Sequence, residues 1–375
     1  MGRLGQQLAD VARRACLAAV VGFGFEGCGE PSLETQVRSV EAYESLDAAA
    51  VARVSLVRVG GISLRGDVGG GLLDVSDVSL GPTRVAVIDR MSNRVAVFER
   101  ESGELRGSFG GRRSLAPSGL SDPVRVNWLE DGSLLVLDIT HPTRLRRFSE
   151  SGDLLGPFMY QPPQPAVAAV TSADVVVLGL VDPENADRPG RVVAGSGAGR
   201  RFALNACPRN AMLDQSRRTR GMIASFALLD VAVVADTMYC AEGISPLVGV
   251  SLLDGTVLPD RRVAPPWYRP PRDRRFSNRE SEFMRFQSEW TYHARLFTLK
   301  ADLVSVFLET PANDTSSTFR LFGCPRALRV QECWSTETAL RPLGVTREQE
   351  FMLLERVPSA REHGSIGLYT LERAK

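Results

Sequence analysis

Two segments near the start of the chain share one pattern of hydrophobic and polar positions. Residues 85–110 read VAVIDRMSNRVAVFERESGELRGSFG, and residues 134–158 read LLVLDITHPTRLRRFSESGDLLGPF. In each, an apolar run ends in Asp, a polar turn leads to a run that ends in Phe, and a Gly-containing turn leads to a third run. Runs of this length between turn residues predict short antiparallel β-strands.

Matching positions in the two segments indicate an internal repeat. Asp138 follows Asp89 by 49 residues, and Arg144 follows Arg94 by 50. Residues 123–128 and the Asp-Gly turn after them supply a further strand ahead of the second segment. Four short strands in a repeat of about fifty residues are typical of a β-propeller blade.

The same rhythm continues more weakly to the end of the chain. Four further units cover residues 167–204, 222–263, 292–333 and 343–372, and the last of them lacks one strand. Residues 53–64 form a spare strand at the front, and its pairing with the last unit removes the open edges of the ring. We therefore expect an all-β domain over residues 52–375, a six-bladed β-propeller of four-stranded antiparallel blades that is closed by an N-terminal strand.

The first repeat also carries a recognisable family pattern. Val87 to Asp89, followed by Asn93 to Phe98, resembles V-x-D-x-x-x-N-R-V-x-V-F of the NHL-type six-bladed propellers, whereas the second repeat has Thr143 at the position of the Asn. The chain is most similar to the exported, often lipid-anchored bacterial members of unassigned function. The resemblance implies the fold and export, and says little about activity.

The first 28 residues have the composition of a targeting segment. Arg3, Arg13 and Arg14 precede an apolar run over residues 15–25, which is too short to span a bilayer as a helix. A basic region followed by a short apolar run is typical of a secretory signal peptide, and a short buried helix is the alternative. We expect residues 1–28 to direct export, with the protein in the periplasm or at the cell surface.

Cys28 ends this segment and resembles the lipidated cysteine of bacterial lipoproteins. Gly27 precedes it as the lipobox requires, although Phe25 and Glu26 replace the usual Leu and small residue. If Cys28 is acylated, the polar residues 29–51 form a tether between the membrane and the propeller. Export without a lipid is the alternative.

The remaining cysteines favour disulfides. Cys324 and Cys333 flank a short segment between two expected strands, a separation that a hairpin brings within disulfide range. This pairing leaves Cys207 with Cys240, and four free buried thiols in a cytosolic protein are the alternative. No Cys-x-x-Cys motif or Cys/His cluster predicts a metal site.

One segment departs from the repeat. Two Pro-Pro pairs within residues 264–275 preclude regular structure there, whereas residues 276–290 have the capping and hydrophobic spacing of an inserted amphipathic helix. The helix packs on the propeller itself or on a partner. The segment also gathers side chains that form a candidate binding loop or hold the segment against the ring: Trp267, Tyr268, Arg269, Arg272 and Arg275.

Candidate chemistry is sparse elsewhere. The formal net charge is +1, which gives no field that attracts nucleic acid. The three histidines, His141, His293 and His363, are isolated, and the repetition of Asp89 and Asp138 favours a turn-capping role over metal ligation. We expect Arg94 and Arg144 to pair with acidic groups. No motif indicates a catalytic residue, cofactor or metal.

Two functions of different classes remain open. The first is a non-catalytic binding or scaffolding propeller that contacts protein or glycan through its loops. The second is a metal-dependent hydrolase or lyase with a site in the central channel, as in lactonases that resemble gluconolactonase. Those enzymes need an inward-facing cluster of Glu, Asp and Asn, and no segment presents that motif.

Overall fold

The computed structural model describes β-structure along most of the chain. The described residues are 40–41, 51–66, 72, 74–111, 119–138, 144–157, 165–170, 175–180, 191–196, 201–206, 229–243, 247–253, 256–262, 265–269, 288–289, 291–300, 302–309, 318–325, 332–357 and 363–373. The side chains of strands between 165 and 206 are outside this description. The chain divides between Arg38 and Ser39, and every described residue belongs to the C-terminal unit.

Successive strands of this unit pair into four-stranded antiparallel meanders. The first contains β3 (Val75–Leu80), β4 (Arg84–Asp89), β5 (Arg94–Glu99) and β6 (Leu105–Gly110). The second contains β7 (Pro123–Trp128), β8 (Leu134–Asp138), β9 (Arg144–Phe148) and β10 (Leu154–Pro157). The third contains β11 (Pro165–Val170), β12 (Val175–Leu180), β13 (Arg191–Ser196) and β14 (Arg201–Ala206).

The later meanders receive strands from the front of the chain. β15 (Leu229–Val234), β16 (Thr237–Glu242), β17 (Leu247–Leu252) and β18 (Val257–Arg262) are joined at the edge by the short parallel strand β1 (Val40–Glu41). β19 (Tyr292–Leu299), β20 (Asp302–Glu309), β21 (Thr318–Pro325) and β22 (Trp334–Thr338) form one half of an eight-stranded sheet. β23 (Arg341–Val345), β24 (Phe351–Arg356), β25 (Gly364–Arg373) and β2 (Ala52–Leu64) form the other half.

β2 is the spare N-terminal strand of the sequence, and it contacts three meanders. Ala52 and Arg53 pair in parallel with the start of β22, and Val54–Leu64 pair antiparallel with β25. Just beyond β2, Arg65 forms a parallel bridge with Glu104 beside β6. The missing strand of the last repeat is therefore supplied from the other end of the chain.

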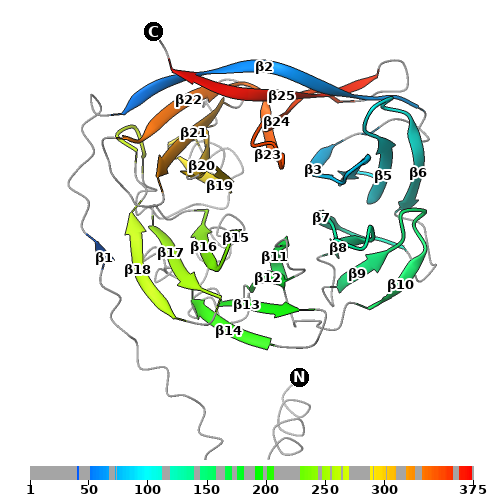
Figure 1. The fold of residues 1–375 in the computed structure, drawn as a ribbon, viewed down its shortest axis with the longest axis horizontal. Helices are drawn as coiled ribbons and strands as arrows, with labels where there is room; N and C mark the ends of the chain where they lie inside the picture. Colours follow the sequence, from blue (N-terminus) through cyan, green and yellow to red (C-terminus); the bar gives the residue numbers. More distant parts are fainter. Residues whose placement is uncertain are drawn as a thin grey trace, which may run out of the picture. The chain divides into compact units, whose positions relative to one another are not determined.

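The first strand of each meander is the innermost one. Each of these strands contacts the next in chain order, from β3 to β7, β11, β15, β19 and β23, and β23 contacts β3 again. Figure 1 shows the innermost strands turned toward a common centre. The described elements are β-strands in a propeller-like arrangement, and the expected helix over residues 276–290 lies outside the described residues apart from 288–289.

Burial on both sheet faces explains the hydrophobic runs of the sequence. In β4, Val85 and Val87 pack into a cluster with Met352 of β24, whereas Ala86 and Ile88 pack into a second cluster with β7–β9. Because successive side chains of a strand point to opposite faces, a strand between two sheets needs apolar residues at every position. Apolar runs without alternation therefore mark the middle strands.

Glycines of the repeat permit close packing between meanders. Gly103 has φ +74, and a Cβ there would lie 2.2 Å from the carbonyl oxygen of Ser63. Gly152, its counterpart in the next repeat, has φ +91 and would meet Phe109 at 2.6 Å. Both positions need glycine, since the backbone is left-handed and the neighbouring meander leaves no room.

Candidate functional site

A charged cluster occupies the innermost strands of the described chain. We define the central charge cluster as Asp77 (β3), Arg125 (β7), Asp230 (β15) and Arg295 (β19). Asp77, Arg125 and Arg295 each lie directly after a shift in the pairing register of their strand. Because a bulge redirects the side chain that follows it, these irregularities in β3, β7 and β19 place charged residues in contact, whereas β15, which carries Asp230, pairs without a shift.

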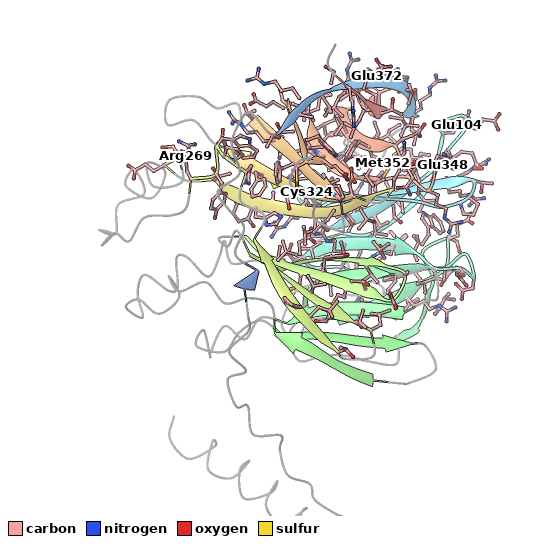
Figure 2. The ribbon with its side chains drawn as sticks, turned by 60° about the vertical axis from the view of Figure 1, so that its left-hand side comes forward. Glu104, Arg269, Cys324, Glu348, Met352 and Glu372 are labelled. Carbon is pink, nitrogen blue, oxygen red and sulfur yellow. A yellow bond between two sulfur atoms is a disulfide. The ribbon has the colours of Figure 1, made fainter. Side chains whose placement is uncertain are left out.

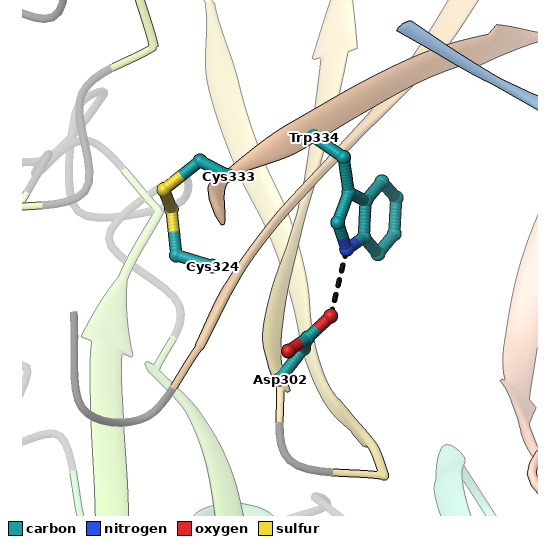
Figure 3. The surroundings of a disulfide bond; sticks show 4 residues. All are labelled: Asp302, Cys324, Cys333 and Trp334. Atoms are coloured by element: carbon teal, nitrogen blue, oxygen red, sulfur yellow. Dashed lines mark hydrogen bonds between the residues drawn. A yellow bond between two sulfur atoms is a disulfide. The ribbon is translucent and has the colours of Figure 1, made fainter. Parts of the chain in front are cut away.

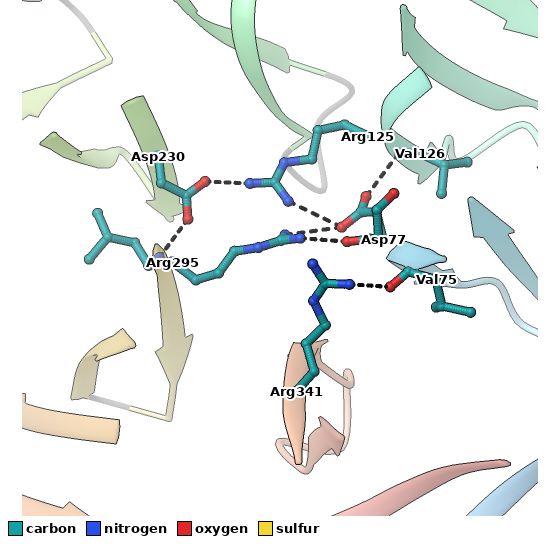
Figure 4. A network of polar contacts seen from close by, with 9 residues as sticks. Val75, Asp77, Arg125, Val126, Asp230, Arg295 and Arg341 are labelled. Atoms are coloured by element: carbon teal, nitrogen blue, oxygen red, sulfur yellow. Dashed lines mark hydrogen bonds and ion pairs between the residues drawn. The ribbon is translucent and has the colours of Figure 1, made fainter. Parts of the chain in front are cut away.

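Asp77 is the acceptor for two arginines. Its Oδ1 lies 3.2 Å from Nη1 of Arg125 and 3.0 Å from Nη1 of Arg295. Its Oδ2 accepts the backbone amide of Val126 at 3.0 Å. Figure 4 shows the two guanidinium groups approaching this carboxylate from β7 and β19. Both oxygens of Asp77 are thus satisfied by groups from two other meanders, through β7 and β19.

Asp230 completes a circuit of contacts around the centre. Its Oδ1 accepts Nη2 of Arg125 at 2.8 Å, and its Oδ2 accepts the amide of Leu296 at 2.5 Å. Arg295, adjacent to Leu296, also donates through Nη2 to the Ser76 carbonyl at 2.8 Å. Polar contacts therefore lead from β3 to β7, β15, β19 and back to β3.

The cluster is poorly exposed to solvent, and this burial governs its electrostatics. The side chains of Asp77 and Arg125 are 7% and 13% exposed. Burial raises the pKa of Asp77 to about 6, against the lowering effect of Arg125 and the Val126 amide. Burial also raises the pKa of Asp230, again opposed by Arg125. Each carboxylate depends on its arginine for charge compensation.

The arginine at the centre of the cluster is held in its charged form. Burial lowers the pKa of Arg125, but Asp230 and Asp77 raise it, and the net change is a rise. Tyr292 lies beside them, and burial together with the charge of Asp230 raises the pKa of its phenol. Tyr292 therefore remains neutral.

A further pair extends these contacts to β23. Nη1 of Arg341, the first residue of β23, lies 2.9 Å from Oδ1 of Asp74 and 2.9 Å from the carbonyl oxygen of Val75 (Figure 4). This pair is more exposed than the cluster. It connects β23 to the start of β3.

The pairing of charges decides what the cluster can do chemically. A divalent cation needs carboxylate or carbonyl oxygens with free lone pairs, and Asp77 and Asp230 already accept hydrogen bonds from guanidinium and amide groups. No group of three His, Cys, Asp or Glu side chains in the described part of the chain is placed to hold a metal ion. The geometry favours cross-linking of the inner strands.

The repeated aspartates lie at the ends of β4 and β8 and accept backbone amides. Oδ1 of Asp89 accepts the amide of Asp74 at 3.0 Å, ahead of β3. Oδ1 of Asp138 accepts the amide of Asp122 at 2.7 Å, and its Oδ2 accepts that of Ser121 at 3.2 Å, ahead of β7. Both carboxylates cap the segment that leads into an inner strand, as expected from the repeat. Both are fully buried.

The arginines of the repeat are placed across the same hairpins. Arg94 pairs in register with Asp89, and Arg144 pairs in register with Asp138. The side chain of Arg144 lies outside the described residues, so its expected ion pair stays a prediction. The matching register shows that the two sequence repeats are structurally equivalent.

The candidate binding loop is described only at its start. Trp267 and Tyr268 pack edge-on against Phe307 of β20, at centroid distances of 5.3 and 5.8 Å. The guanidinium of Arg320 lies 4.9 Å from the Trp267 ring. These contacts hold both aromatic residues against the sheet, which is one of the two roles expected from the sequence.

Of the three arginines in the candidate binding loop, one is described. Arg269 is half exposed, at 50%, and lies 3.6 Å from Glu309 (Figure 2). Its backbone is fixed by hydrogen bonds with Thr291 in both directions. Arg272 and Arg275 lie outside the described residues.

One predicted disulfide is present among the described residues. Cys324 and Cys333 are bonded, and Figure 3 shows the bond beside Trp334, whose indole Nε1 donates to Asp302 at 2.8 Å. Cys240 is also disulfide-bonded, and its predicted partner Cys207 lies outside the described residues, as does Cys28. Disulfides are typical of proteins that fold outside the reducing cytosol.

The histidines stay separate where they are described. His293 is buried and stacks on Phe307 at 4.8 Å between ring centroids. His363 is exposed, and His141 lies outside the described residues. In the part of the chain that the structure describes, no helix is long and apolar enough to cross a membrane.

Sequence reasoning missed the central charge cluster. Asp77, Arg125 and Arg295 were available as charged residues within strands that also carry apolar residues, a pattern that is compatible with buried partners. However, Asp77 and Arg295 are 218 positions apart, and only the closed series of strands brings them together. An aligned comparison of the innermost strands would have shown charged residues at related positions.

Comparisons with known proteins show the fold alone. No family model and no curated relative matches the chain. A DUF4221 family member from Bacteroides vulgatus is similar over 86% of this chain and 99% of its own, at 10% identity and a TM-score of 0.54. A putative exported protein from Bacteroides fragilis is similar over 89% of this chain and 98% of its own, at 8% identity and a TM-score of 0.53.

An enzyme is among the similar structures as well. The PQQ-bound aldose sugar dehydrogenase from Streptomyces coelicolor matches 86% of this chain and 99% of its own, at 10% identity and a TM-score of 0.51. The sugar dehydrogenase and the two Bacteroides proteins thus share this arrangement of strands. This chain is all-β and propeller-like, and the likeness does not distinguish binding from catalysis.

Proposed function

We propose that the protein is an exported, non-catalytic binding or scaffolding propeller that contacts a protein or glycan through its loops. The central charge cluster is the observation that carries this proposal. In a channel enzyme the inward-facing carboxylates hold a metal or a substrate, whereas here Asp77 and Asp230 are occupied by Arg125 and Arg295. The cluster gives the centre a structural role and leaves the loops for recognition.

The proposed architecture is a six-bladed ring closed by β2. Support comes from the repeating contacts of the inner strands, β3 to β23 and back to β3, and from the pairing of β2 with β25 inside the last four-stranded unit. We assign residues 52–375 to the ring, residues 1–28 to a signal peptide and residues 29–51 to the tether. Val40–Glu41, within this tether, pair with β18 and so shorten its free length.

Export and anchoring follow the N-terminal sequence and the disulfides. A buried disulfide at Cys324–Cys333 and a bonded Cys240 suit an oxidising compartment. In the proposal Cys28 carries a lipid, and the ring lies in the periplasm or at the cell surface. In the proposal the protein resembles the exported NHL-type propellers and acts without a cofactor, a metal or nucleic acid.

The candidate recognition element is the arginine-bearing loop after β18. Trp267 and Tyr268 fix the start of this loop against the sheet. In the proposal Arg269, Arg272 and Arg275 supply its binding groups. Guanidinium groups bind carboxylate and phosphate groups in a bidentate manner, which suits an acidic protein segment or an acidic glycan.

Cross-linking in native envelopes, followed by affinity capture of the full chain, tests this function. A variant with Arg269, Arg272 and Arg275 all changed to Ala should lose the partner that the wild type retains. The matched control changes three exposed arginines on other meanders, Arg58, Arg90 and Arg106, and should retain it. Equal recovery of the partner by both triple variants would contradict the assignment of the loop.

The alternative function is a metal-dependent hydrolase or lyase, which the sequence leaves open. At the central charge cluster, it requires that a divalent ion displace an arginine from Asp77 or Asp230. Lactone hydrolysis that needs added metal and disappears in Asp230→Asn would favour this alternative and would contradict the binding proposal.

A further inference from the structure

The buried disulfide lies where the N-terminal strand joins the ring. The backbone amide of Ala52 donates to the carbonyl of Cys333 at 3.0 Å, and Ala52 then pairs in parallel with Trp334. Val51 packs against the hydrophobic cluster that contains both Cys324 and Cys333. The first residues of β2 therefore contact the disulfide-bonded segment directly.

Cys333 depends on its side chain for its position. The pairing of β21 with β22 begins at Gly323 and Trp334, so Cys333 lies outside that ladder, whereas Cys324 pairs within the sheet with Leu303. The disulfide consequently ties Cys333 to β21 directly, beyond the last pair of that ladder, Gly323 with Trp334. It fixes the acceptor that receives the Ala52 amide.

The rest of β2 is held differently. Val54–Leu64 pair along β25, and Val54 and Leu56 pack against a cluster that includes Trp334 and Phe351. Only Ala52 and Arg53 pair with β22. The start of the strand is thus the part that is most easily separated from the ring, and it is also the part that continues into the proposed tether.

We propose that the Cys324–Cys333 disulfide fastens the start of β2 to the ring, so that the junction between β2 and the segment before it is fixed only after oxidation. In the reduced protein β2 stays paired with β25 but its first residues separate from β22. The proposal goes beyond the binding function and rests only on the described contacts around Cys333.

Hydrogen exchange of the full chain tests the fastening. In the double variant Cys324→Ser/Cys333→Ser, amides at residues 52–53 should exchange faster by about tenfold or more, while those at residues 56–62 keep their protection. The control Val136→Ala creates a cavity in a distant core. It should leave the ratio of the exchange rates at residues 52–53 and 56–62 at its wild-type value. Unchanged exchange at residues 52–53, or an equal rise along all of β2, would overturn the proposal.

A second variant keeps the proposal testable if the cysteine variant does not fold. Ala52→Pro removes the amide that donates to Cys333 at the first position of the strand, where proline is tolerated. Because the coupling is reciprocal at equilibrium, the ratio of dithiol to disulfide at a fixed ratio of reduced to oxidised dithiothreitol should then be several-fold higher than in the wild type, as dithiothreitol is oxidised and two cysteine thiols form. Ala52→Gly, which keeps the amide, should give the wild-type equilibrium ratio. Equal ratios in both variants would contradict the coupling.

Discussion

The substitution Asp77→Ala removes the acceptor that two arginines share at the centre of the ring. Arg125 and Arg295 approach this carboxylate at 3.2 and 3.0 Å, and the Val126 amide donates to it at 3.0 Å. Arg125 keeps Asp230, whereas Arg295 keeps only the Ser76 carbonyl among its described contacts. The variant therefore leaves Arg295, whose side chain is 18% exposed, as a largely buried positive charge without a carboxylate.

The expected cost follows from this burial. Removing one partner of a buried ion pair typically destabilises a protein by about 3–5 kcal/mol. Asp122→Ala is the matched control, since it removes a carboxylate that pairs with Arg90 at 3.0 Å but in an exposed position. Exposed pairs of this kind contribute about 0–1 kcal/mol. The two losses should differ by several-fold.

Urea unfolding at neutral pH, followed by circular dichroism and tryptophan fluorescence, measures the loss of unfolding free energy in Asp77→Ala and in Asp122→Ala. Coinciding transitions in the two signals are needed before the free energies are compared. A double-mutant cycle with Arg125→Met should give a coupling energy of about 1 kcal/mol or more with Asp77, because residues in one network are not additive. The reasoning is refuted if Asp77→Ala loses no more stability than Asp122→Ala.

Three further results are expected. The folded-state pKa of Asp77 is above its usual value, at about 6, so the native state binds more protons than the unfolded state between about pH 4 and pH 6, and stability falls as pH rises through that range. Urea unfolding at several pH values should show that the wild type loses up to about 3 kcal/mol relative to Asp77→Asn over this range. Parallel stability curves for the two proteins would contradict this expectation. Gly103→Ala should destabilise by roughly 1–3 kcal/mol, since φ is +74 and the new Cβ meets the Ser63 carbonyl, whereas Gly107→Ala on the following strand β6, with open space around it, should cost less than about 1 kcal/mol in the same assay. Cys28→Ser should release the protein from the membrane fraction or leave unprocessed precursor, and wild-type fractionation and migration would exclude lipidation at Cys28.

Local patterns in the sequence predict the strands and their grouping. The apolar runs of β4 and β8 are uninterrupted because both faces are covered, and the glycines at 103 and 152 mark turns where a side chain would collide with the neighbouring meander. The role of residues 53–64 as the missing strand also follows from local pattern, because a unit that lacks one strand needs one from elsewhere.

The central charge cluster does not follow from local pattern. Asp77 and Arg295 differ in residue type, and neither repeats at a fixed spacing as Asp89 and Asp138 do. Their contact depends on the ring and on the register shifts that redirect their side chains. The aromatic start of the candidate loop illustrates the same limit, since Trp267 and Tyr268 fit either recognition or packing until Phe307 is placed beside them.

The central claim is that Asp77 and Asp230 are structural groups neutralised by Arg125 and Arg295. The most direct test is the metal content of the protein after dialysis against calcium, manganese and zinc. The account predicts that the folded wild-type chain retains no ion at a one-to-one ratio, as measured by mass spectrometry of the metals, and that its thermal unfolding temperature does not change with added ion. One ion per chain in the wild type, lost in the Asp77→Asn and Asp230→Asn variants, would contradict it.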